Sequence, residues 1–253
     1  RFPATAMVMM TGWWPVAGRE ATPLPVWDPP LAGAPVPRDY VSWPRIVTVS
    51  GDPRATVPAS IAFAGRTFTD PPAIDIGRFQ HIRVDAAMAR RLMADAGSRK
   101  AALIALERPL RAGDQLVLVA LHLLSYAQAD GHWATFWWHD QPDRGRFARD
   151  RPAGLPPPWR NYLMDQTEDA ALPAEHDGSP RICFNPWFEA RFPDGGNGGG
   201  HLSNCVACHA RAGFPRTDFL PIRRGAPDYA HDPAFAAGRL RTGGLWSLGN
   251  PGA

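Results

Sequence analysis

The sequence predicts a loop-rich α+β fold with a mainly antiparallel β-sheet and a few short helices. The 28 prolines and 24 glycines among the 253 residues mark turns and loops along the whole chain. Residues 115–126 and 132–139 are two apolar runs separated by an Asp-Gly turn signal, which is the pattern of a β-hairpin. The strongest helical pattern is confined to residues 86–96. Strands are therefore expected to contribute more of the fold than helices.

The N-terminal residues 1–40 are rich in proline and tryptophan. Proline lacks an N–H donor and has a fixed φ, which disfavours both sheet ladders and helices. This segment is therefore predicted to be an extended arm without regular structure. Residues 41–253 are expected to form a single β-rich domain. A long insertion in that domain is expected around residues 141–200, where proline, glycine and acidic residues accumulate.

Three strands are expected before the helical segment. A β-branched run predicts the first strand within residues 40–50, closed by Gly51-Asp52-Pro53. Weaker patterns predict further strands at residues 61–68 and 80–84. These strands would add to the sheet that the later hairpin forms.

Asp85 is a favourable N-cap for a helix over residues 86–96, and Gly97 is expected to end that helix. Residues 101–106 are then interpreted as a strand. The hairpin over residues 115–139 has apolar side chains on both faces of each strand, so it is expected at the centre of the sheet.

The segment after the hairpin has weaker signals. Residues 140–160 are polar and proline-rich, which predicts a long surface loop. A helical turn is expected over residues 161–166.

The most specific motif is Cys205-Val206-Ala207-Cys208-His209. Cys-x-x-Cys-His is typical of the attachment site of a c-type haem. Residues three apart on a helix share a face, so both thiols could bond to one edge of the porphyrin. The imidazole of His209 could then bind the iron as an axial ligand. The sequence therefore predicts one covalent haem c held by Cys205 and Cys208, on a short C-terminal helix that Ser203 or Asn204 caps.

A zinc site is the alternative interpretation of the same cysteines. A Cys-x-x-Cys pair is half of a structural zinc site, and Cys183 with His201 could complete a Cys3His set. If Cys205 and Cys208 bind haem instead, Cys183 has no cysteine left for a disulfide. Cys183 is then expected to be a small buried apolar residue.

The sixth position of the iron is open to several candidates. Strand alternation places His122 on an apolar face of the predicted hairpin, which makes it a candidate distal ligand. The other candidates are His201, Met164, and one of His132 and His139. An open site is a further alternative.

Charge and hydropathy exclude several classes of partner. The net charge of +3 is small and unclustered, so we expect no nucleic-acid partner. No run of 18 apolar residues is present, so the chain is not expected to be transmembrane.

Covalent haem attachment takes place outside the bacterial cytoplasm. A periplasmic or extracytoplasmic location is therefore expected, reached by means of a signal peptide that this sequence does not contain.

Three segments together resemble a known family. They are Asp39-Tyr40-Val41-Ser42-Trp43, the aromatic residues 132–138, and Cys205-Val206-Ala207-Cys208-His209 with Thr217-Asp218-Phe219 after it. They are similar to the opening strand, aromatic strand and haem segment of the β-sheet cytochromes. This group comprises the c-prime-beta family and its lysine-cross-linked, hydroxylamine-oxidising relatives. The resemblance implies that Cys205, Cys208 and His209 bind haem, and Lys100 is the only candidate for a cross-linking lysine.

Three functions follow as expectations. The first is a periplasmic monohaem electron carrier or redox subunit, which would act with a redox partner protein, within a larger complex or as a homodimer. The second is an open-site haem protein that binds or oxidises a small molecule such as NO or hydroxylamine; an enzyme of this kind would be a haem oxidoreductase. The third is a secreted β-domain with a structural zinc site.

Overall fold

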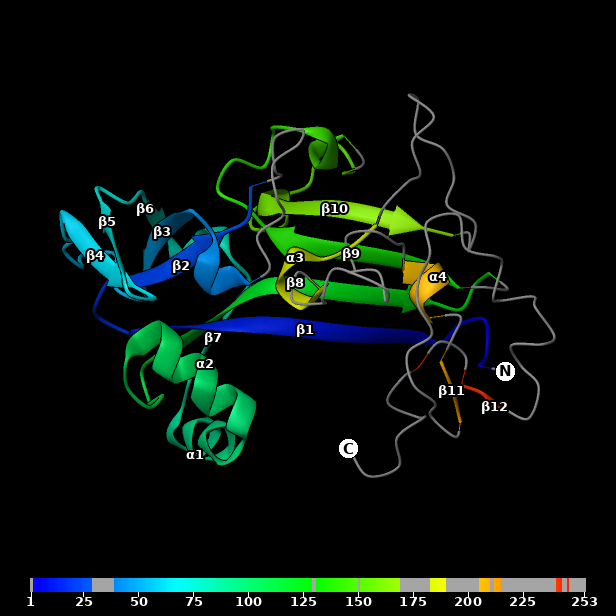
Figure 1. The fold of residues 1–253 in the computed structure, drawn as a ribbon, viewed down its shortest axis with the longest axis horizontal. Coiled ribbons are helices and arrows are strands. Elements are labelled where there is room, and N and C mark those ends of the chain that lie inside the picture. Colours follow the sequence, from blue (N-terminus) through cyan, green and yellow to red (C-terminus); the bar gives the residue numbers. More distant parts are fainter. Residues whose placement is uncertain are drawn as a thin grey trace. The chain divides into compact units, whose positions relative to one another are not determined.

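The computed structural model describes most of the N-terminal two thirds of the chain and selected segments after it. The described residues are 2–28, 39–128, 131–149, 151–168, 183–189, 205–209, 212–214, 240–242 and 245. Within them, the fold is α+β, loop-rich and mainly antiparallel, as the sequence predicts (Figure 1). No helix among these residues is long and apolar enough to cross a membrane.

The largest sheet has the strand order β1-β8-β9-β10, and β7 also pairs with β8 (Figure 1). Its strands are β1 (Met7–Val16), β7 (His81–Arg83), β8 (Gln115–Ser125), β9 (His132–Trp138) and β10 (Tyr162–Thr167). β8 and β9 are the predicted hairpin and lie between β1 and β10. Their connection is too short for a crossover, so the two strands are antiparallel. Val117 and Trp137 are completely buried, which agrees with the central position that their apolar sequences predict.

Three smaller sheets complete the described strands. β2 (Thr22–Val26) pairs antiparallel with β3 (Arg45–Ser50), which pairs in parallel with β6 (Ala73–Asp75). β4 (Ser60–Phe63) and β5 (Arg66–Thr69) form a hairpin. β11 (Gly213–Phe214) and β12 (Leu240–Arg241) pair antiparallel. The single strand predicted over residues 61–68 is therefore two strands. Ala64 and Gly65 both have positive φ and form the turn between them.

The prediction that residues 1–40 lack strands is wrong, because β1 and β2 both lie in this segment. Both are edge strands, and an edge strand needs N–H donors on one side only. Pro23 and Pro25 alternate along β2, so their nitrogens can both face away from β3. The carbonyl of Pro23 also faces away from β3, since it accepts a hydrogen bond from Trp14 Nε1 (2.9 Å).

Asp85 caps helix α1 (Ala86–Ala94) as predicted, and its Oδ1 accepts from Met88 N (2.7 Å). The helix ends before Gly97, however, because Asp95 caps a second helix, α2 (Ala96–Leu106). The strand predicted over residues 101–106 is therefore wrong. The alanines of this segment favour a helix, and Ala102 and Ala105 form its buried face.

The other boundaries differ through local capping. The strand predicted from residue 40 begins only at Arg45, because Asp39 caps a 3-10 turn, η1 (Tyr40–Ser42). Residues 140–160 are mostly loop with the short turns η3 (Arg146–Ala148) and η4 (Trp159–Asn161). The helical turn predicted over residues 161–166 is instead strand β10.

Contacts divide the chain into two compact units. The first comprises Arg1–Met10, His122–Phe136 and Met164–Ala253, and the second comprises Thr11–Leu121 and Trp137–Leu163. The first unit contains α3 (Pro186–Glu189) and α4 (Cys205–His209). The Cys-x-x-Cys-His motif, Cys183 and His122 all belong to this unit.

Candidate functional site

The Cys-x-x-Cys-His motif forms helix α4, which begins at Cys205 and ends at His209. Cys205 and His209 are therefore one helical turn apart. The chain leaves the helix through a turn in which Ala212 N donates to the His209 carbonyl (3.0 Å). Cys208 lies within the helix, but its side chain is outside the described part of the structure. The predicted capping residues Ser203 and Asn204, as well as His201, also lie outside it.

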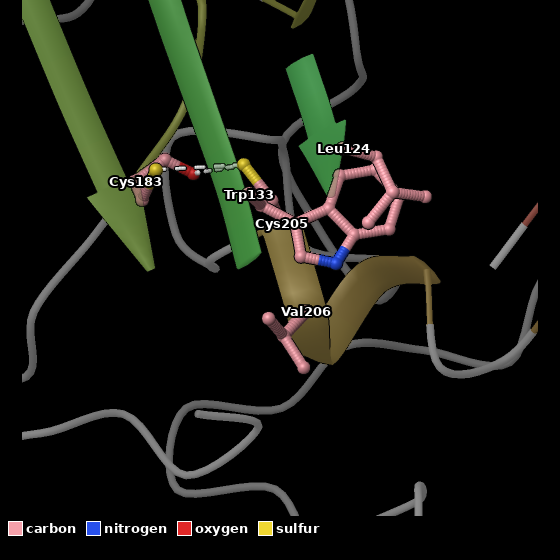
Figure 2. Packing of buried hydrophobic residues seen from close by; sticks show 5 residues of the cluster. All are labelled: Leu124, Trp133, Cys183, Cys205 and Val206. Carbon is pink, nitrogen blue, oxygen red and sulfur yellow. Dashed lines mark hydrogen bonds between the residues drawn. The ribbon is translucent and has the colours of Figure 1, made fainter. Parts of the chain in front are cut away.

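Cys205 is the centre of a buried apolar cluster in the first unit. Figure 2 shows the five residues of the thiol cluster, which are Leu124, Trp133, Cys183, Cys205 and Val206. Leu124 comes from β8 and Trp133 from β9, so the central hairpin supplies one wall of the cluster. Cys205 is 4% exposed and Val206 is 2% exposed. The first thiol of the motif is therefore enclosed by apolar side chains.

Cys183 lies directly against this thiol. Its Sγ is 3.4 Å from the Sγ of Cys205, and the two sulfur atoms face one another in Figure 2. The Cys205 Sγ also lies 3.8 Å from the carbonyl oxygen of Cys183. Both cysteines are free thiols. Cys183 is buried, as predicted. Its contact with the motif was expected only in the zinc alternative.

Asn185 fixes the segment that carries Cys183. Its Nδ2 donates to Thr135 Oγ1 (2.7 Å) and to the carbonyl of Phe136 (2.9 Å), both on β9. Its own backbone N–H donates to Glu189 Oε2 (2.6 Å), and Trp187 N donates to its Oδ1 (3.0 Å). The completely buried Asn185 thus fastens α3 to the sheet two residues after Cys183. The Asn-Pro pair at residues 185–186 is the only sequence signal for this turn.

The environment of the two thiols favours their neutral forms. The contact with Cys183, followed by burial, raises the pKa of the Cys205 thiol well above its usual range. The contact with Cys205 tends to lower the pKa of Cys183, but burial and the carboxylates of Asp165 and Glu189 outweigh it and raise this pKa. Neither thiol is therefore a reactive thiolate in the folded chain.

His209 packs against an aromatic side chain of the hairpin. The ring centroids of His209 and Trp133 are 4.2 Å apart and the rings are inclined by 39°. The indole Nε1 of Trp133 is buried and has no hydrogen-bond partner among the described residues. Gly131 lies just before β9 with φ of +80°, and a Cβ there would come 2.7 Å from Leu124 and 3.2 Å from Trp133 Nε1. A larger residue at this position would therefore displace the wall on which His209 rests.

His122 lies near α3. Its Nε2 is 3.3 Å from Glu189 Oε1, and its ring packs against Phe188 with centroids 4.8 Å apart. The structure therefore places His122 in the same unit as Cys205 and His209, in contact with a carboxylate. Its role as distal ligand remains a prediction.

The remaining candidates within the described residues have the following positions. His132 Nδ1 is 2.8 Å from Glu168 Oε1, and Met164 is buried in β10. His139 belongs to the second unit. Lys100 is an exposed residue of α2.

A polar cluster in the second unit contains His139 and an arginine that pairs with two carboxylates. Arg45 Nε and Nη2 donate to the two carboxylate oxygens of Asp28 (both 2.7 Å), and Arg45 Nη1 donates to Asp140 Oδ2 (2.8 Å). Gln141 N donates to His139 Nδ1 (2.9 Å), so the proton of this imidazole is on Nε2, 3.2 Å from Asp28 Oδ1. Burial alone would raise the pKa of Asp28, but the hydrogen bonds from Arg45 and His139 hold it well below its ordinary range. We call these four residues, Asp28, Arg45, His139 and Asp140, the Arg45 network.

The residues around α4 fit a haem c by the chemistry of their donors. A thiol and an imidazole lie one helical turn apart, next to an apolar wall with a buried indole N–H that lacks a partner among the described residues. In the whole described part of the chain, no group of three or more His, Cys, Asp or Glu side chains is placed so that it could hold a metal ion. No protein family, curated protein or solved structure matches this chain.

Proposed function

We propose that this chain is a monohaem c-type cytochrome in which Cys205 and Cys208 attach one haem covalently and His209 is an axial ligand of its iron. One observation carries the proposal. The Cys-x-x-Cys-His motif occurs on a helical turn whose first thiol is buried among apolar residues and whose histidine packs on Trp133. A bound haem would supply reversible one-electron chemistry between ferric and ferrous iron.

The residues of the chain would provide attachment and a controlled environment. Cys205 and Cys208 would hold the group through thioether bonds, and His209 would supply a neutral imidazole. Trp133 and Leu124 would exclude water from one side, which affects the reduction potential. The Trp133 N–H would be available as a donor to a polar part of the bound group.

We further propose that the protein is a periplasmic electron carrier or redox subunit. This role rests on the attachment chemistry of the motif and on the resemblance of three segments to the β-sheet cytochromes. It requires a redox partner protein, and the chain would act within a larger complex or as a homodimer.

The test is haem retention in matched cysteine variants. The full chain is exported together with a cytochrome c maturation system, purified, and denatured in acidified acetone before its intact mass is measured. We expect wild type and Cys183→Ala to keep one haem, Cys205→Ala and Cys208→Ala to lose most of it, and the double variant to keep none. Bare polypeptide mass in wild type would overturn the proposal.

The contact between Cys183 and Cys205 supports a second candidate, a structural zinc site. Two thiolates on a tetrahedral zinc lie about 3.8 Å apart, given Zn–S bonds of about 2.3 Å. The observed separation of 3.4 Å is close to this value. Cys208 and His201 would complete the set of ligands. Elemental analysis separates the two candidates, because stoichiometric zinc that is lost in Cys183→Ala, without haem, would favour this one.

The contact of His122 with Glu189 bears on the open-site alternative, in which the haem binds or oxidises a small molecule. Nε2 of His122 lies 3.3 Å from Glu189 Oε1, so Nδ1 is the ring nitrogen through which His122 would coordinate iron. A vacant sixth position is the alternative. Carbon monoxide titration of the ferrous protein separates the two cases. Rapid binding by wild type would indicate an open site. Slow binding that becomes fast in His122→Ala would identify His122 as the ligand and support the electron carrier.

A further inference from the structure

We propose that Cys183 and Cys205 form a disulfide in the haem-free protein, and that this disulfide must be reduced before Cys205 can attach haem. The first half of the proposal concerns a modification site that the haem function does not require. The second half rests on the proposed function. Both follow from the position of Cys183, which the motif itself does not explain.

The two sulfur atoms are already close to bonding distance. They are separated by 3.4 Å, and a disulfide bond is about 2.05 Å long, so closure requires a movement of about 1.4 Å. Both side chains lie in the same apolar cluster, between Leu124, Trp133 and Val206. No charged side chain belongs to this cluster of buried residues, so no ion pair needs to break when the bond forms.

The segment that carries Cys183, the partner of Cys205, is anchored to β9 by Asn185. The hydrogen bonds of Asn185 to Thr135 and Phe136 fix the chain two residues beyond Cys183. The sulfur of Cys183 therefore faces Cys205 because α3 docks on β9 at this point. The same docking would bring the two sulfur atoms together in every folded molecule.

The oxidation is a thiol–disulfide exchange with an external disulfide, such as oxidised glutathione or the disulfide of a protein oxidant. One cysteine thiolate attacks the external disulfide and releases the first acceptor thiol. The second cysteine thiolate then attacks the mixed disulfide and releases the second acceptor thiol. The chain loses two electrons and two protons, and the acceptor gains both. The products are the Cys183–Cys205 disulfide and two acceptor thiols.

Burial decides when this exchange takes place. Cys183 is 1% exposed and Cys205 is 4% exposed, so an external oxidant reaches them before the cluster closes during folding. Once the cluster is closed, the same burial protects the disulfide from reductants. While it persists, the sulfur of Cys205 cannot add to a haem vinyl group, because a thioether forms from a free thiol. A dithiol reductant must therefore act before or during attachment.

The first experiment maps the disulfide in the full chain exported without haem attachment. The protein is acid-quenched, alkylated in denaturant without reductant, digested and analysed by mass spectrometry. We expect a peptide cross-linked between Cys183 and Cys205, together with alkylated Cys208. Cys208→Ser should keep the cross-link, whereas Cys183→Ser and Cys183→Ala should both lack it. Three alkylated thiols, thiols protected by zinc until a chelator is added, or a link between Cys205 and Cys208 would overturn the proposal.

The second experiment measures covalent haem yield in the maturation system as a function of added dithiol. If the Cys183–Cys205 disulfide blocks attachment, added dithiol should raise the haem yield of wild type several-fold. Cys183→Ala should give a high yield without dithiol, and dithiol should change that yield by less than about two-fold. Equal dithiol dependence in both proteins would overturn the second half of the proposal. Failure of every variant to attach haem would reject the proposed function but leave the mapped disulfide intact, so the two failures are distinguishable.

Discussion

The thiol cluster and the Arg45 network bury reactive groups in opposite ways. In the Arg45 network, one guanidinium donates to two carboxylates, and both ring nitrogens of His139 are within hydrogen-bonding distance of fixed partners. In the thiol cluster, two sulfur atoms contact each other among apolar side chains, and the indole N–H of Trp133 has no partner among the described residues. The Arg45 network is therefore built on paired charges, although Asp140 Oδ1 is buried without a hydrogen-bond partner among the described residues. The thiol cluster is built on thiols and apolar side chains.

This difference indicates which region performs chemistry. A network of paired charges resists change, because removal of one partner leaves another charge unpaired. Thiols and an indole N–H without strong partners lose little when a ligand or a covalent bond engages them. We therefore expect substitutions in the thiol cluster to change haem binding, and substitutions in the Arg45 network to change stability alone.

The largest expected effect is that of His209→Ala on iron coordination. The variant should keep the thioether-linked haem, because both cysteines remain, but lose the native axial bond. Low-temperature EPR of the ferric protein measures the change. His132→Ala is the matched control, since its side chain pairs with Glu168, and its spectrum should equal that of wild type. An unchanged spectrum in His209→Ala would show that another residue is the ligand.

The second effect concerns the wall of the thiol cluster. Trp133→Ala should destabilise the haem-free chain by about 3–5 kcal/mol, because a buried aromatic side chain is lost. The corresponding fall in Tm is roughly 10 °C. Trp133→Phe should cost about 1–2 kcal/mol, since the N–H it removes has no partner among the described residues. Equal losses in both variants, measured by calorimetry, would mean that the N–H is hydrogen-bonded.

The third effect tests the opposite region. Arg45→Met should cost about 2–3 kcal/mol, because the side chain of Asp140 is only 6% exposed and would be left without its cation. Arg160→Met is the control. Its ion pair with Asp143 is more than half exposed at both ends and should contribute less than about 0.5 kcal/mol. Neither variant should alter the haem spectrum, and a spectral change in Arg45→Met would refute the separation of roles.

The smallest effect is the pH dependence of the Arg45 network. The folded chain holds the pKa of Asp28 below its ordinary value of about 3.9, so this carboxylate stabilises the fold above that pH. The contribution is lost as the pH falls through the folded pKa. Asp28→Asn should therefore lose less stability than wild type between about pH 5 and pH 3. The difference is below about 1 kcal/mol, because Asp28 is 41% exposed. Urea titrations at each pH measure it, with the exposed Glu20→Gln as a control that should follow wild type.

The features that the sequence predicts correctly are those with local causes. The apolar alternation of β8 and β9, the N-cap Asp85 and the helical turn of the motif all depend on neighbouring residues. The wrong predictions at β1 and β2 arose because edge pairing, which tolerates proline, is a property of the assembled sheet. The strand expected at residues 101–106 failed because Asp95 starts a second helix of good helix formers.

From the sequence, Cys183 is expected near Cys205 only in the zinc alternative, and no local pattern predicts the contact. It depends on where α3 docks, and that docking rests on hydrogen bonds from Asn185 to residues about 50 positions earlier in the chain. No local pattern encodes contacts of this range. The motif identifies the chemistry of α4, whereas its immediate surroundings follow only from the folded chain.

The central claim is that two thioether bonds at Cys205 and Cys208 hold one haem per chain. The most direct measurement is the alkaline pyridine haemochrome spectrum of the purified full chain after extraction with acidified acetone. The account predicts one haem per chain that stays with the protein, with the band position of a haem whose two vinyl groups are both saturated. Haem that is extracted into the solvent, or a protein without haem after export with an active maturation system, would contradict it.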